Sequence, residues 1–424
     1  MERSLYASGR AFAGRGQLSG QKNTVLRNFT CLLMLPYILI FLGVLPGREI
    51  YPTIFSIAVF AVFLLWCLAA FDIKIRRKAG AAFLLVALWA ALLLVLNFGS
   101  LRARSDVVYD ANTLVGLGML FLIFAARHLL FTREMLESAL KAIVGFGLLS
   151  SVVNIVQNYD GVFSLAAVTQ VYSVKFTGLF LGRNQFGWYL YLCLICCMLL
   201  KHLFGARVHP AVFFLLAVNL FFTFSRAAML SAAVFFGLYW LDIRRPKKVL
   251  LLLVLLAAFL LLYFTTDLRG MIDRFLIRSN FGDSGRTDRW GALLDTLRQR
   301  EYGLWGVSPA LFKELLLLNG IEQIDNAYLE ILASYGFPGC LLYAGVFVSV
   351  FVRIKRAEVG RENKRLLTAA VLSFLVLGCF ESLLLFEVGL NQWTATLVIV
   401  VLPRFCSAHT SDAERGRRIQ RELL

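Results

Sequence analysis

The segment at 222–227, FTFSRA, places one arginine between two long apolar runs. A guanidinium held against a low-dielectric surface binds phosphate through two parallel hydrogen bonds, so Arg226 is a candidate anion-binding residue. The alternative is structural: the side chain could lie along apolar surface at a helix end, with only its charged tip in water. The residue type alone leaves both interpretations open.

A second basic segment, 284–290, reads SGRTDRW. Its two arginines, Arg286 and Arg289, could hold a phosphate while the ring of Trp290 stacks on a sugar. The alternative is that the segment is simply the solvated start of a helix.

A third segment, 178–187, reads GLFLGRNQFG and carries Arg183 and Asn184 between glycines. It is either a turn that faces a ligand or a helix cap. Glu381 is a further candidate, because an acid within an apolar run is costly unless it binds or pairs with something. We assign all three polar residues to substrate binding.

A fourth segment, 325–332, reads DNAYLEIL and precedes a long apolar run. Asp325 could be a carboxylate general base at the membrane surface, or only the N-cap of the helix that follows. We assign the base role to Asp325 and substrate-binding roles to its neighbours Asn326 and Tyr328.

Metal chemistry is disfavoured by where the histidines fall. All four lie in segments that we expect on the cytoplasmic side, away from the polar segments above, so we expect no zinc site and no cofactor. Cysteines at 193, 196 and 197 resemble a metal-binding spacing but stand among Leu, Ile and Met, which indicates small buried thiols. The histidines are His128, His202, His209 and His409.

The elements that carry these residues must be membrane helices. Of 424 residues, 59% are hydrophobic and 16% are charged, and apolar runs recur along nearly the whole chain. A soluble protein of this composition could not cover its surface with polar groups, whereas a helix of about 20 residues satisfies its own backbone in lipid. We predict an all-α bundle with spans at 29–45, 53–70, 81–99, 112–130, 141–157, 182–200, 210–224, 227–241, 249–265, 328–352, 366–386 and 389–403.

The formal net charge of +17 could suggest nucleic acid, but Lys and Arg concentrate in alternate short loops, which is the charge bias that orients spans. It predicts both termini in the cytoplasm, no nucleic-acid partner, and no cleaved signal segment. Between spans seven and eight only Ser225-Arg226 is polar, so these spans form a tight hairpin or one broken helix. The chain thus divides into a cytoplasmic tail (1–28), nine spans (29–265), a large extracytoplasmic loop (266–327), three spans (328–403) and a cytoplasmic tail (404–424).

The loop at 266–327 carries helix signals of its own. Ser308-Pro309 suits an N-cap followed by proline in the first turn, and Gly320 suits a helix end. Apolar residues in 290–297 have helical spacing. We expect a small, mostly helical cap over the outer face.

The four segments, in this order along 177–339, resemble the bacterial O-antigen ligase and polymerase superfamily. The resemblance implies a metal-independent glycosyltransferase of the bacterial cytoplasmic membrane, with its active site on the extracytoplasmic face. The donor would be an oligosaccharide on a polyprenyl diphosphate. Arg226 and Arg286 match the family's paired diphosphate-binding arginines, and a chain-length regulator and a flippase are expected partners.

One departure from the ligase pattern bears on the reaction. Ligases of this superfamily usually have His-Asn where this chain has Asp325-Asn326. The Asp-Asn form is more like the polymerases of capsule and exopolysaccharide assembly, so we favour a repeat-unit polymerase over a ligase that moves finished glycan to a lipid or cell-wall acceptor. A transporter or flippase is the third hypothesis, although transporters tend to show internal repeats and none is visible here.

Overall fold

The computed structural model describes residues 24–47, 50–70, 104–125, 131–159, 176–240, 286–299, 305–318, 324–385 and 387–407. The predicted spans 81–99 and 249–265, most of both tails, residues 266–285 of the predicted loop, and Gly320 lie outside the described residues.

Within these ranges every regular element is helical, as predicted. Four helices are long and apolar enough to cross a membrane, and three apolar helices are shorter. The number of spans and the side of the termini stay predictions. The elements are the first helix Thr24–Phe41, then α2 (Ile50–Ala70), α4 (Arg104–Ala125), α5 (Arg133–Gln157), α8 (Arg183–His202), α9 (Pro210–Phe222), α10 (Arg226–Trp240), α13 (Arg286–Gln299), α14 (Pro309–Leu318), α15 (Ala327–Arg356), α16 (Arg361–Gly378), α17 (Leu390–Thr396) and the π-helix Leu397–Val401.

Several helices begin earlier than the apolar runs that predicted them. The span predicted at 141–157 is α5, which starts at residue 133 because the Thr132 hydroxyl accepts a hydrogen bond from the Met135 amide at 3.3 Å. A side-chain cap of this kind satisfies a donor of the first turn, so a helix extends into polar sequence.

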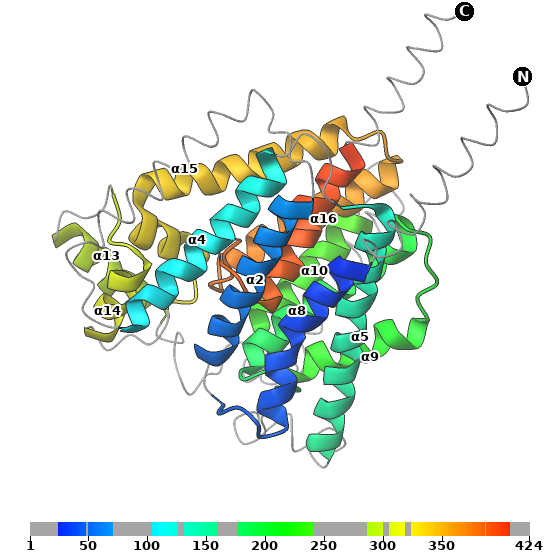
Figure 1. Ribbon diagram of the computed structural model, residues 1–424, viewed down its shortest axis with the longest axis horizontal. Helices are drawn as coiled ribbons and strands as arrows, with labels where there is room; N and C mark the ends of the chain where they lie inside the picture. Colours follow the sequence, from blue (N-terminus) through cyan, green and yellow to red (C-terminus); the bar gives the residue numbers. More distant parts are fainter. Residues whose placement is uncertain are drawn as a thin grey trace, which may run out of the picture.

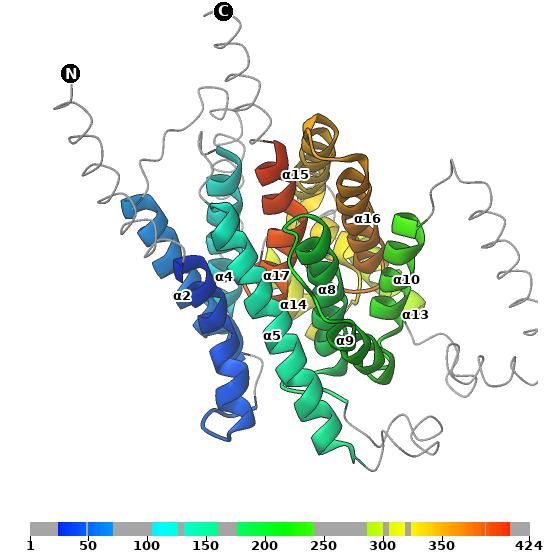
Figure 2. The same ribbon diagram turned by 90° about the vertical axis from the view of Figure 1, so that its right-hand side faces the viewer.

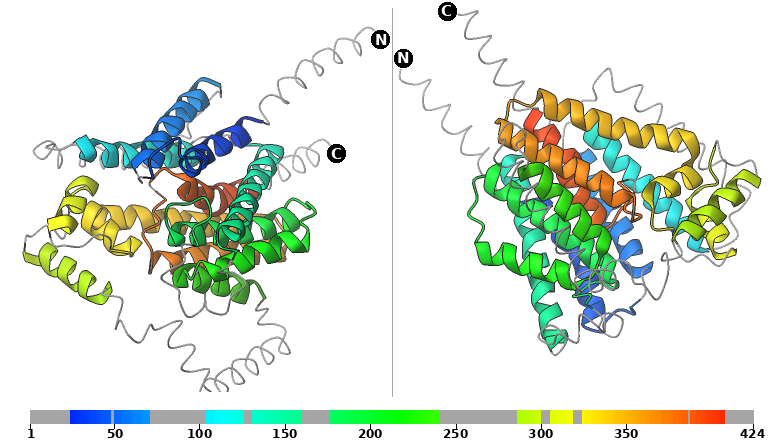
Figure 3. Two further views of the ribbon diagram at one scale, coloured as in Figure 1. Left: turned by 90° about the horizontal axis from the view of Figure 1, so that it is seen from below. Right: turned by 180° about the vertical axis from the view of Figure 1, so that it is seen from behind.

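The C-terminal helices occupy the middle of the bundle. Seen from below, α17 lies between the N-terminal helices and the group α8–α10, and in the side view most helices run roughly alongside one another (Figures 2 and 3). The ring of Trp393 in α17 packs edge-on against Phe29 and Phe60, and its Nε1 donates to Thr30 Oγ1 at 3.1 Å. One aromatic side chain therefore ties α17 to the first helix and to α2.

Helix α8 is buried along most of its length. The hydroxyls of Tyr191 and Ser373 form a hydrogen bond of 2.6 Å that joins α8 to α16. Cys193, Cys196 and Cys197 are buried free thiols, which confirms the interpretation of that triplet as packing residues.

Helices α9 and α10 are separate and take different neighbours. The turn between them is closed by Thr223, whose hydroxyl donates to Leu220 O at 2.7 Å and accepts from Ser225 N at 3.2 Å. Phe224 has a φ of 51°, in the left-handed region. Helix α10 packs mainly against α16 while α9 packs on α8 and α5, so the polar break at Ser225-Arg226 separates two helices with different neighbours.

The described part of the predicted loop at 266–327 is largely helical, and we call α13, α14 and the residues beside them the cap; its place on the outer face stays a prediction. Helices α13 and α14 lie to one side of the bundle, beside α4 and the first turns of α15 (Figure 1). Ser308 precedes Pro309 as predicted, and its Oγ accepts from Leu311 N at 3.4 Å. A second apolar cluster unites the cap with α15; its buried members are Leu293, Leu297, Val307, Phe312, Leu315, Leu316, Ile324 and Ala333.

The cap is fastened where α15 breaks. The predicted tenth span is interrupted at Gly336 (φ 60°, ψ −162°), two residues before Pro338, and its two parts run in different directions (Figure 1). Proline has no N–H for the carbonyl four residues earlier, Ser334 O. That carbonyl accepts from Ser308 N at 2.9 Å, and Ala333 O accepts from Val307 N at 2.9 Å. The backbone of the cap thus replaces the hydrogen bonds that the kink removes.

The predicted span 366–386 is too long. Helix α16 ends at Gly378, so Glu381 lies in the irregular segment that follows and not within a helix. This backbone is held by side chains of other elements: Asn326 Nδ2 donates to Cys379 O at 3.1 Å, and Asn112 Oδ1 accepts from Val388 N at 2.8 Å. Buried backbone outside a regular helix is stable when protein groups satisfy its N–H and C=O groups in this way.

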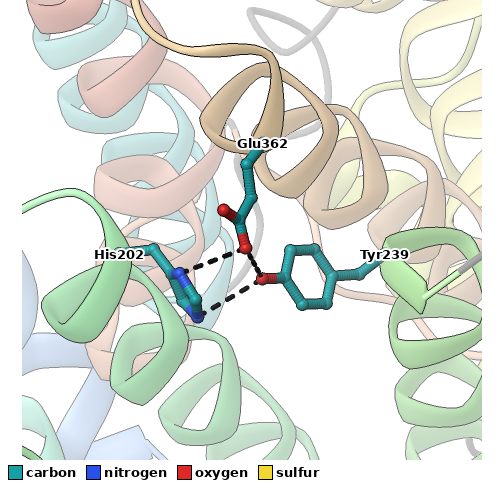
Figure 4. Close-up of polar contacts among 3 residues, drawn as sticks. All are labelled: His202, Tyr239 and Glu362. Carbon is teal, nitrogen blue, oxygen red and sulfur yellow. Dashed lines mark hydrogen bonds and ion pairs between the residues drawn. The ribbon is translucent and has the colours of Figure 1, made fainter. Parts of the chain in front are cut away.

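At the other end of the bundle, three helices meet through one polar cluster (Figure 4). The Tyr239 hydroxyl of α10 donates to Glu362 Oε1 of α16 at 2.6 Å and lies 3.3 Å from Nε2 of His202, at the end of α8. His202 Nδ1 is 3.4 Å from the same carboxylate oxygen. The cluster fixes the ends of α8 and α10 against the start of α16.

Candidate functional site

A cavity of about 650 Å³ opens at the end of the bundle that carries the cap. Its size is that of a typical small-ligand site. The walls come from α2, α4, the first turns of α8, the cap and the segment between α16 and α17. Of the predicted site residues with described side chains, Asn184, Arg289 and Asp325 line it.

Asp325 and Arg289 form the charged centre of this cavity. Arg289 Nη2 lies 3.5 Å from Asp325 Oδ2, and both side chains are largely buried. Asp325 has a φ of 52°, a left-handed conformation that Asp tolerates better than most residues and that recurs at functional sites. The structure thus joins two of the predicted segments.

The helix cap is Asn326, not Asp325. Asn326 Oδ1 accepts from the amides of Tyr328 and Leu329, both at 3.0 Å, at the start of α15. The alternative role considered for Asp325, as N-cap of the tenth span, is therefore wrong. Since its neighbour caps the helix, the Asp325 carboxylate is available to face the cavity.

Three residues predicted to bind substrate instead make side-chain hydrogen bonds to backbone carbonyls of the protein. Trp290 Nε1 donates to Ile324 O at 2.8 Å, directly before Asp325, and the Tyr328 hydroxyl donates to Leu375 O at 2.6 Å. Asn326 bridges α15 to Cys379. They are not among the described residues that line the cavity, and their contacts indicate that they position those that do.

The predicted turn at 178–187 combines both interpretations considered for it. Gly178 has a φ of 55°, and the chain then enters α8 at Arg183, with Asn184 facing the cavity. The turn is held by α5: Leu179 N donates to Ser150 Oγ at 3.0 Å, and Gly178 N donates to Asn154 Oδ1 at 3.3 Å.

Arg226 lies at the same end of the bundle. It begins α10, directly after Ser225, which packs on α8 at Gly187. A Cβ on Gly187 would lie 2.6 Å from Ser225 Cβ, so only glycine permits this approach. Arg226 is half-buried and is not among the described residues that line the cavity.

Arg286 begins α13, and its side chain lies outside the described part of the structure. Glu381 is buried but does not line the cavity described.

Sequence reasoning missed two acids and a lysine that line the cavity: Glu330, Glu387 and Lys313. Burial, together with the nearby Glu330, raises the pKa of Glu387 to about 8. Lys313 opposes this shift, and so to a smaller extent does Gln392, whose Nε2 donates to Glu387 Oε2 at 3.4 Å. Glu387 stands between the last two predicted spans, and an acid in that position was a usable signal. Among the described residues, the cavity included, no three His, Cys, Asp or Glu side chains are grouped so that they could hold a metal ion.

Comparison with known proteins yields one match. Residues 211–344 match the O-antigen ligase family, while neither the curated proteins nor the solved structures give a match. The matched stretch includes the turn before α10, the cap, Asp325 and the kink of α15. This match supports the resemblance inferred from the four segments: over residues 211–344 the chain is similar to the O-antigen ligase family.

Proposed function

We propose that the protein is a membrane glycosyltransferase that polymerises oligosaccharide repeats carried on a polyprenyl diphosphate, at the extracytoplasmic face. The observation that carries this proposal is the Asp325–Arg289 pair inside the cavity, within the stretch that matches the family. The pair supplies a base beside a cation, which the transfer requires. The apolar helices support a membrane location.

In the proposed reaction, an acceptor hydroxyl oxygen attacks the anomeric carbon of the donor. The bond from that carbon to the phosphate oxygen breaks, and the diphosphate leaves with the electron pair. Asp325 takes the proton of the hydroxyl. Cations near the departing oxygens stabilise the charge that develops there, so bond breaking needs no acid.

Arg289 has two partners in this scheme. In the structure it is paired with Asp325, and their 3.5 Å separation is long for a tight ion pair. A bound diphosphate draws the guanidinium towards itself and leaves the carboxylate to accept from the hydroxyl. Arg226 and Arg286 take the diphosphate-binding roles that the family resemblance gives them, and Lys313 adds a further cation to the cavity.

Polymer length in cells tests these roles. Arg286→Ala and Asp325→Ala should each shift the product from long chains to single repeats. Arg298→Ala is the matched control, since Arg298 is exposed on the same helix as Arg286. Normal long chains in both variants, with the protein present in the membrane, would remove the assigned roles.

A ligase is the second candidate, because the matched family is described by that activity. Deleting the gene separates the two. Loss of a polymerase leaves single repeats on the carrier, whereas loss of a ligase leaves long chains on it. Transfer of glycan by the purified protein would exclude the transporter hypothesis.

A further inference from the structure

Two buried polar atoms, each on a residue that lines the cavity, have no hydrogen-bond partner among the described residues. They are Nε1 of Trp188, a donor, and Oδ1 of Asn391, an acceptor; the residues are 7% and 5% exposed. A buried polar group without a partner costs free energy, and native proteins rarely retain one without a reason. A ligand that both donates and accepts would satisfy the two atoms.

The two residues belong to one wall of the cavity. Asn391 Nδ2 donates to Gln185 O at 3.2 Å, which holds the start of α17 against the first turn of α8. Gln185 and Trp188 are three residues apart on α8, so they share a face of that helix. Asn184, Gln185, Trp188, Glu387, Asn391 and Gln392 together form what we call the amide wall.

The amide wall contains no cation, whereas the cations described in the cavity, Arg289 and Lys313, both come from the cap. A diphosphate is therefore drawn towards the cap. The wall offers amides, an indole N–H and a carboxylate, which suit hydroxyl groups, and Glu387 disfavours an acidic sugar on its side.

We propose that the amide wall is a subsite for an uncharged sugar ring, with Trp188 Nε1 donating to one sugar oxygen and Asn391 Oδ1 accepting from a hydroxyl. The inference rests on the proposed function, because it assigns the glycan part of that substrate. It adds which residues select the sugar, and it separates them from those that hold the diphosphate.

Binding by the purified full chain tests the subsite with two probes. One is the repeat-unit oligosaccharide released from the carrier lipid of cells that lack the gene. The other is polyprenyl diphosphate without sugar. Equilibrium dialysis measures each on the wild type, on Trp188→Phe, on Asn391→Ala, and on the control Trp240→Phe, whose ring is 63% exposed on α10.

Trp188→Phe keeps an aromatic ring and removes only the donor. It and Asn391→Ala should each bind the oligosaccharide about five- to tenfold more weakly, with binding of polyprenyl diphosphate unchanged. Equal oligosaccharide affinity in Trp188→Phe and wild type would overturn the subsite. So would a wild type that binds only the sugar-free lipid, or neither probe.

The outcomes separate this inference from the proposed function. A wild type that binds the oligosaccharide through Trp188 but shows no affinity for polyprenyl diphosphate would keep the subsite and remove the proposed donor. Thermal unfolding of each variant shows whether a weaker affinity comes from loss of fold.

Discussion

At the residue scale, the proposed catalytic base and the residue that caps the following helix are neighbours in the chain. Asp325 faces the cavity with Arg289, while Asn326 caps α15 and bridges to Cys379. Asp325→Asn keeps size and tolerance of the left-handed conformation but removes the base. We expect a loss of transfer rate of at least about 100-fold, with a melting temperature close to that of the wild type.

The neighbouring position gives the contrast for that prediction. Asn326→Ala should lower the free energy of unfolding by about 1–2 kcal/mol, because two amides lose their acceptor. Transfer rate and thermal unfolding, measured on both variants, should separate. A large stability loss in Asp325→Asn, or normal transfer by it, would contradict the division of roles.

Glu387 makes a pH-dependent prediction. Its pKa is raised to about 8 by burial and by Glu330. Between about pH 4.3 and 8 the Glu387 carboxyl is therefore protonated in the folded chain and ionised in the unfolded chain. Its contribution to stability therefore falls as pH rises through that window. Glu387→Gln should raise the melting temperature relative to wild type, and by more at pH 8 than at pH 5. A difference that is constant with pH would show that Glu387 is not protonated in the folded state.

At the element scale, Gly187 determines how closely the turn before α10 approaches α8. An alanine Cβ would lie 2.6 Å from Ser225 Cβ, so the turn, and Arg226 with it, must move. We expect Gly187→Ala to cost about 1–3 kcal/mol of unfolding free energy. Gly237→Ala on α10 is the control, since nothing lies within 4 Å of its Cβ position. Chemical denaturation of both variants measures the difference. Equal free energies of unfolding would show that the Gly187–Ser225 contact has room for a methyl group.

The sequence predicts the features that depend on residues close together in the chain, and it does not predict those that depend on how distant segments fold together. Apolar runs and the Ser308-Pro309 signal predict helices, because span length and capping depend on neighbours in the chain. Arg289 and Asp325 were found as separate candidates, but their pairing depends on how the cap folds back onto α15. Trp188 and Asn391 gave no signal, since a tryptophan and an asparagine near helix starts usually pack or cap. The end of α16 at residue 378 was hidden because side chains of α4 and α15 satisfy the apolar segment after it.

At the scale of the whole molecule, the cavity and the Tyr239–Glu362–His202 cluster lie at opposite ends of the same helices. Helix α8 begins at the cavity with Asn184 and ends at the cluster with His202. The kinked α15 and the cap close one end, and polar contacts among α8, α10 and α16 close the other. That the cluster end of the bundle faces the cytoplasm stays a prediction of the charge pattern in the loops.

The cluster makes the last prediction. The hydrogen bond from the Tyr239 hydroxyl is the largest effect that holds the pKa of Glu362 below its usual range. Burial opposes it, and the charges of His202, Arg365 and Lys201 each add a smaller lowering effect. A depressed carboxyl pKa stabilises the fold above the unfolded pKa, about 4.3, and this contribution is lost as pH falls through the folded pKa. Glu362→Gln should therefore lower the melting temperature at pH 7, and the gap to wild type should close below about pH 4. Glu314→Gln, on the exposed side of α14, is the control. Thermal unfolding across this pH range decides the matter: a gap that persists in acid would mean that Glu362 acts through shape and not through charge.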